Sequence, residues 1–143
     1  VDRVIPRAIG VLVRQGEPLV TIEQGGRQLV LVAPVTGKVT FHNDPLLSRP
    51  AVLGRGTYGE NWVCVLQPTH LAEEIGTLRV ARVASEWFRQ EFRRLADCLA
   101  DLVPAKAGMA MQDGGMPVAG ALRELPDEAW ARFQGEFLGA PPA

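Results

Sequence analysis

The chain has 143 residues, of which 47% are hydrophobic and 22% charged, and its formal net charge is −1. This length fits one domain with an appended segment, and the composition suffices for a packed core. Because the charge is balanced, the chain lacks the positively charged surface that nucleic-acid binding requires. It also has no apolar run of about 18 residues, so membrane insertion is not predicted. Two cysteines without zinc or disulfide spacing favour a reducing, cytoplasmic setting.

Residues 1–68 alternate short runs of Val, Leu and Ile with Gly, Pro and Asn, which predicts a β domain of short strands and turns. Strands are expected at Arg3–Pro6, Leu19–Glu23, Gln28–Val32, Lys38–Phe41 and Trp62–Leu66, and a Pro-rich loop at Asn43–Arg55. The pair Gly25-Gly26 separates two of these strands. Because both glycines can adopt positive φ, the pair predicts a two-residue hairpin turn.

Residues 69–103 have the pattern of a helical extension packed on the β domain. Thr69 is a candidate N-cap of a short helix, and Ser85 is a candidate cap within or at the start of a second one. An apolar stripe at helical spacing follows, made of Trp87, Phe88, Phe92, Leu95, Leu99 and Leu102. We expect this stripe to pack on the sheet of its own chain, with a partner protein as the alternative.

Residues 104–125 are rich in Pro, Gly, Ala and Met, which predicts a linker or arm. A terminal amphipathic helix is predicted at 126–138, because Pro and two acids stand where a helix begins. Trp130, Phe133 and Phe137 share one face of this helix. Their rings either fold back onto the same domain or bind a partner protein in the helix-in-groove manner.

Three stretches, read together, resemble the glycine cleavage H protein, over about residues 4–95. They are Gly10–Leu19, Ala33–Val39, and a block that joins Asn43, Pro45, Leu46 and Leu47 to Tyr58–Trp62. The second is similar to the S-P-V-S-G of lipoyl and biotinyl domains, and the third to the P-Y-G-x-G-W of H proteins. The resemblance implies an α+β fold: mainly a β barrel-sandwich hybrid of two small sheets, followed by C-terminal helices.

The resemblance also implies a lysine at the hairpin tip, which holds lipoate on an amide and carries groups between enzymes. Counting back from Ala33-Pro34 puts that position at Gly26, and Glu23 matches the acid that precedes the family's lysine. Gly25 completes the turn, and the guanidinium of Arg27 cannot form the amide. The biotin signature Met-Lys-Met is also absent. We therefore expect no cofactor, and no metal.

The resemblance implies two further N-terminal strands that do not precede Val1. A missing upstream segment or a neighbouring chain is expected to add strands at this edge. Catalysis is not expected, because neither His42 nor His70 stands in a catalytic or metal-binding pattern.

The leading interpretation is a non-lipoylated, H-protein-like adaptor or docking subunit of a larger complex, redox complexes included. One alternative is a carrier with another group attached at Lys38 or Lys106, the only lysines. The other is a small-molecule-binding domain that uses the Gly54–Gly59 loop and Trp62.

Overall fold

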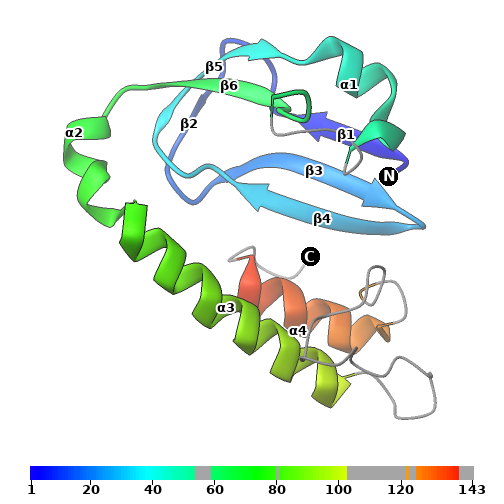
Figure 1. The fold of residues 1–143 in the computed structure, drawn as a ribbon. Coiled ribbons are helices and arrows are strands. Elements are labelled where there is room, and N and C mark those ends of the chain that lie inside the picture. The colour runs from blue at the N-terminus through cyan, green and yellow to red at the C-terminus, as the bar shows by residue number, and fades with distance from the viewer. Residues whose placement is uncertain (54–58, 80, 103–121, 123–124, 139–143) are drawn as a thin grey trace. The chain divides into compact units, whose positions relative to one another are not determined.

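The computed structural model describes residues 1–53, 59–79, 81–102, 122 and 125–138 (Figure 1). The chain divides into two compact units, one built on Val1–Leu78 and the other on Arg79–Phe137. The first unit carries all the described strands, and the second carries the two longest helices. Each unit is described by itself.

The β unit consists of two three-stranded antiparallel sheets, each formed by strands that are not all consecutive in the chain. One sheet has the order β1-β3-β4, with β1 at Arg3–Pro6, β3 at Pro18–Gln24 and β4 at Arg27–Val32. The other has the order β2-β5-β6, with β2 at Leu12–Val13, β5 at Gly37–His42 and β6 at Cys64–Pro68. The five predicted strands are confirmed within a residue or two at each end, and the sequence pattern missed β2.

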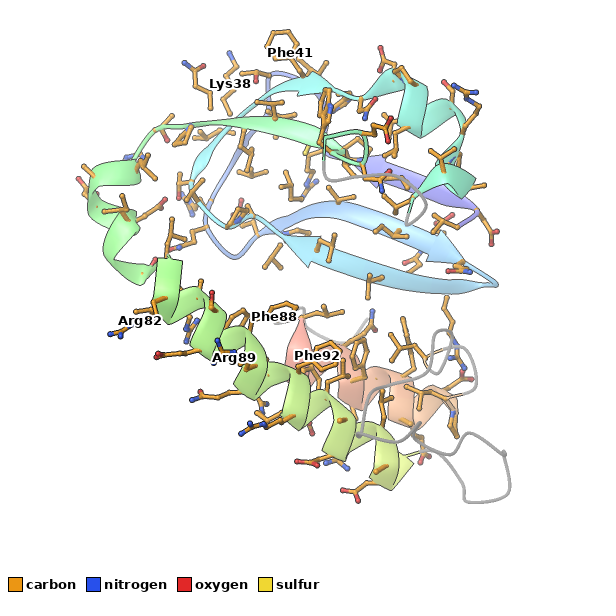
Figure 2. All side chains as sticks on the ribbon, viewed as in Figure 1. Lys38, Phe41, Arg82, Phe88, Arg89 and Phe92 are labelled. Carbon is orange, nitrogen blue, oxygen red and sulfur yellow. The ribbon has the colours of Figure 1, made fainter. Side chains whose placement is uncertain are left out.

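Both sheets contribute side chains to one hydrophobic core. Its buried members are Val4, Val13, Leu19, Val20, Ala33, Val39 and Leu46. On β5, Val39 is fully buried in this core, whereas Lys38 and Phe41 are exposed and point away from it (Figure 2). Gly37, Lys38 and Val39 follow the period of two that a strand requires when one face of its sheet is buried. Phe41 departs from this period because the pairing of β5 with β6 shifts register between Val39 and Phe41. The expected α+β fold with two small sheets is thus confirmed.

The loop predicted at Asn43–Arg55 was wrong in part, because it contains helix α1 at Asp44–Ser48 and the 3₁₀ turn η1 at Pro50–Val52. Asn43 starts α1, and its Oδ1 accepts a hydrogen bond from the N–H of Leu46 at 3.4 Å. Its Nδ2 donates to the carbonyl oxygens of Glu60 at 3.0 Å and Trp62 at 2.8 Å. One buried amide therefore caps the helix and fixes the segment that leads into β6.

After β6 the chain forms helix α2 at Leu71–Glu74 and the 3₁₀ turn η2 at Ile75–Thr77, both within the β unit. The N-cap of α2 is His70 and not Thr69 as predicted. The Thr69 hydroxyl is instead 2.9 Å from Nδ1 of His70 and donates to the Thr36 carbonyl oxygen at 3.4 Å.

The helical unit consists of α3 at Ala81–Leu102 and α4 at Asp127–Phe137, which run in opposite directions (Figure 1). Ser85 lies within α3 and not at its start, which is one of the two placements that the sequence left open. The buried side chains of this unit are Ala96, Cys98 and Leu99 of α3, Ala129 and Phe133 of α4, and Leu125, which precedes α4. The linker predicted at 104–125 lies almost entirely outside the described residues, and packing of α3 on the β unit stays a prediction. None of the described helices is long and apolar enough to cross a membrane.

Candidate functional site: the β3–β4 hairpin

The hairpin between β3 and β4 has the two-residue turn that the sequence predicts. Gln24 and Arg27 are the last paired residues, so only Gly25 and Gly26 lie in the turn. Their φ angles are +58° and +81°, in the left-handed region. A turn with positive φ at both central residues matches the twist of the flanking strands, and glycine adopts it without steric cost.

Polar contacts hold this tip against the N-terminal segment. The Asp2 carboxylate accepts a hydrogen bond from the Gly25 N–H at 2.7 Å. Arg3 pairs with Glu23 at 3.3 Å, and Glu23 also accepts a hydrogen bond from Gln28 at 3.1 Å. Glu23, the residue that matches an acid of the family motif, thus links β1, β3 and β4. The tip is an anchored turn whose two exposed residues carry no side chain.

Neither lysine of the chain belongs to this hairpin. Lys38 is exposed on β5, in the other sheet, where it pairs in register with Leu12 and Gln67. Lys106 lies outside the described residues. Arg27, the only cationic side chain in the turn region, is half-buried at the start of β4.

The three aromatic residues predicted as partner-binding lie in one row on α4. Phe133 is buried, with its ring 5.6 Å from that of Trp130 and 5.5 Å from that of Phe137. Trp130 and Phe137 are half-buried, and the Arg94 guanidinium of α3 lies 5.1 Å from the centre of the Phe137 ring. Part of this aromatic row therefore packs within the helical unit.

The other sequence candidates occupy separate places. Residues 54–58 of the proposed ligand loop lie outside the described residues, and Trp62 is 40% exposed. His42 makes a 2.8 Å hydrogen bond to the carbonyl oxygen of Arg7. Over the described part of the chain, no group of His, Cys, Asp and Glu could hold a metal ion.

A polar cluster at the Pro34–Gly37 turn was missed by the sequence reasoning. The Thr36 N–H donates to the Glu74 carboxylate at 2.7 Å, and the Thr36 hydroxyl accepts from the Gln15 N–H at 3.0 Å. The Gln15 side chain donates to Thr77 at 2.9 Å, which in turn donates to the Glu74 carbonyl oxygen at 2.7 Å. These contacts join the β4–β5 turn to α2 and η2, and no short-range pattern links residues so far apart in sequence.

The Glu74 carboxylate should make the stability of the β unit sensitive to acid. Hydrogen bonds from the Thr36 side chain and backbone lower the pKa of Glu74 below its usual 4.5. Because the folded state lowers this pKa, the stabilisation is complete above the unfolded pKa and is lost as pH falls through the folded one. We expect the urea midpoint to fall less between pH 5 and about pH 3 in Glu74→Gln than in the unaltered chain. Parallel midpoint curves for the two proteins would contradict this role.

The β unit has two sheets and an anchored glycine hairpin, and helices follow it. This arrangement defines an α+β protein with lipoyl-domain-like architecture. Residues 3–91 match the family model described as glycine cleavage H-protein. The chain belongs to this family.

Several curated relatives are similar to this chain. A probable glycine cleavage system H protein of Thermococcus kodakarensis is 36% identical over 81 residues, or 57% of this chain and 60% of the relative. The glycine cleavage system H protein 2 of Aquifex aeolicus is 26% identical over 85 residues, or 59% and 53%. The chain thus spans only a little over half the length of these relatives. A crystal structure of an H protein from Mycobacterium marinum aligns with a TM-score of 0.44 and 28% identity, covering 47% of this chain and 53% of that one.

Proposed function

We propose that this chain is a non-lipoylated member of the H-protein family that acts as an adaptor or docking subunit of a larger protein complex. It catalyses no reaction itself, carries no cofactor and works in the cytoplasm. The family scaffold is retained for binding to partner proteins, and the carrier chemistry is lost. Redox complexes are among the candidate partners.

The observation that carries this proposal is the hairpin tip. A swinging arm needs a lysine amine at an exposed turn, but the two turn residues are Gly25 and Gly26. Both are in the left-handed conformation, which a lysine adopts only with strain. The 2.7 Å hydrogen bond from Gly25 to Asp2 further supports a purely architectural role for the tip.

Two surfaces are proposed for partner binding on the basis of the sequence and its pattern. The first is the row Trp130, Phe133 and Phe137, of which Trp130 and Phe137 keep part of their surface exposed. The second is the free edge of β1, since among the described strands β1 pairs only with β3. A strand from a neighbouring chain could extend the sheet there by backbone hydrogen bonds.

The adaptor role is tested by affinity purification of the chain from its native host under gentle, low-salt conditions. We expect it to be recovered in a stoichiometric complex with defined partner proteins, which Trp130→Ala should weaken without unfolding the β unit. Recovery as a lone monomer at native abundance would contradict the adaptor role.

A further inference from the structure

The segment 69–78 connects the last strand of the β unit to the helical unit and contains α2 and η2 (Figure 1). We call this segment the strap. No residue of the strap is buried, and only Glu74 and Leu78 are half-buried. Leu71 is 41% exposed and Ile75 is 54% exposed, so the β unit buries neither side chain. The hydrophobic effect therefore contributes little to holding the strap on the β unit.

The strap also lacks what a short helix needs to be stable by itself. Helix α2 has four residues and η2 has three. Helices of this length are unstable in water without tertiary support, because their few hydrogen bonds do not offset the cost of nucleation. His70, the N-cap of α2, makes no capping hydrogen bond with its side chain. The helical conformation of the strap therefore depends on its contacts with the rest of the β unit.

Hydrogen bonds to two turns of the β unit supply this support. The Glu74 carboxylate accepts from the Thr36 N–H at 2.7 Å, and the Thr36 carbonyl oxygen accepts from the Thr69 N–H at 3.0 Å. The Gln15 side chain donates to the Thr77 hydroxyl at 2.9 Å. These three bonds, which we call the clasp, attach the start, the middle and the end of the strap. The strap is thus held mainly by polar contacts.

The clasp gives the strap a different kind of attachment from that of the strands. The strands share a buried apolar core, which they can leave only together. Release of the clasp exposes little apolar surface, and water can take the place of the hydrogen bonds that are lost. The free energy of this opening is therefore set by a few polar bonds. Elements with few buried apolar contacts open at the low end of the free-energy range within a protein.

We propose that the strap opens locally by release of the clasp while both sheets stay folded, and that the open strap is an extended tether between the two units. The helical unit begins at Arg79, directly after the strap. An extended strap reaches at most about 35 Å, so the helical unit can move without any change in either sheet. This opening is a property of the chain alone and does not depend on the proposed adaptor function.

The test is hydrogen exchange of the full chain at neutral pH, at several urea concentrations below the unfolding midpoint, with mass spectrometry of fragments. A local opening exposes little surface, so the exchange rate that it causes hardly changes with urea. Global opening accelerates as urea rises. We expect the strap to exchange faster than β3 and β5, at a rate that does not depend on urea. The rates of β3 and β5 should rise with urea.

Two variants release the clasp from opposite sides. Glu74→Ala removes the ionised acceptor from the strap and should raise the exchange rate of the strap about tenfold or more. Gln15→Ala removes a donor that lies outside the strap and should raise the same rate about fivefold. Both should leave the rates of β3 and β5 unchanged.

Glu73→Ala is the matched control for Glu74→Ala. Both acids lie in the first turn of α2, so each substitution removes the same charge beside the start of the helix. Glu73 is exposed, whereas the carboxylate of Glu74 reaches Thr36. We expect Glu73→Ala to change the exchange rate of the strap less than twofold.

Four outcomes would overturn the proposal. Equal rates and equal urea dependence for the strap and β5 would show that the strap opens only when the whole unit unfolds. Loss of protection in β5 as well as in the strap, in both Glu74→Ala and Gln15→Ala, would place the strap in the same cooperative core. Equal effects of Glu73→Ala and Glu74→Ala would assign the change to helix charge. Complete lack of protection in the unaltered strap would show that the clasp does not form.

Discussion

Phe133→Ala is expected to destabilise the helical unit by about 3–4 kcal/mol while the β unit stays folded. The side chain is 6% exposed, and its ring contacts those of Trp130 and Phe137. Removing it leaves a cavity beside the rings of Trp130 and Phe137, and an 11-residue helix has little stability of its own. The two compact units have separate cores, so the loss should be confined to Arg79–Phe137.

Hydrogen exchange followed by mass spectrometry measures this directly, because it reports protection segment by segment. We expect α3 and α4 to lose protection in Phe133→Ala and β3, β4 and β5 to keep it. Phe88→Ala is the matched control, since it removes the same ring from an exposed position of the same unit. Loss of protection across every strand would show that α4 belongs to one cooperative core with the β unit.

Gly37→Ala is expected to destabilise the β unit by about 3 kcal/mol, at the upper end of the cost of overpacking. A Cβ at this position would lie 2.6 Å from the backbone oxygen of Gln67 and 3.2 Å from the Cα of Pro68. Both are backbone atoms, so no side-chain rotation relieves the clash. Strands β5 and β6 would have to separate at the end where Gly37 pairs with Pro68.

Chemical denaturation with urea, followed by tryptophan fluorescence and circular dichroism, measures the loss. Gly76→Ala is the matched control, since a Cβ there meets nothing within 4 Å and the residue belongs to the same unit. We expect the control to stay within about 0.5 kcal/mol of the unaltered chain. Equal stability of the two variants would show that β5 and β6 are not packed as closely as described.

The strands and the hairpin could be predicted because their signals are local. Alternating apolar residues and the pair Gly25-Gly26 specify a strand, a turn and a strand without reference to the rest of the chain. Helix α1 was missed because the prolines of its segment were read as breakers, although Asp44-Pro45 stands where proline begins a helix. The cap of α2 was misplaced because Thr69 is bonded to Thr36, far away in sequence.

The absence of a lysine from the hairpin could be predicted from the sequence, whereas the contacts that hold the hairpin tip could not. The printed sequence shows that the hairpin has no lysine, and Gly25-Gly26 predicts its shape. The anchoring of the tip by Asp2 depends on the pairing of β1 with β3, which is a tertiary contact. Gly37 was recognised from the resemblance, which gives no physical reason for a glycine at this position. The structure gives one, because a Cβ here would lie 2.6 Å from the backbone of β6.

The amphipathic patterns identified the apolar faces of α3 and α4, but they did not show which parts of these faces are covered by other elements. The stripe from Trp87 to Leu102 looks continuous in sequence, whereas its two halves have different environments in the structure. Phe88 is 60% exposed and Leu99 is 5% exposed, because α4 is too short to cover both. A periodic pattern specifies a face, and the length and position of the partner helix decide which part of it is buried.

The central claim is that this member of the H-protein family carries no lipoyl group, and the intact mass of the chain tests it most directly. The chain is co-expressed with a lipoate–protein ligase in the presence of lipoate, beside Gly26→Lys as a control that restores an amine at the tip. In this control the lysine at position 26 has to adopt a φ of +81°, which is strained and costs about 1–2 kcal/mol. We predict an unmodified mass for the unaltered chain and one added lipoyl group on Gly26→Lys. A lipoyl group on the unaltered chain, mapped by fragmentation to Lys38 or Lys106, would contradict the account.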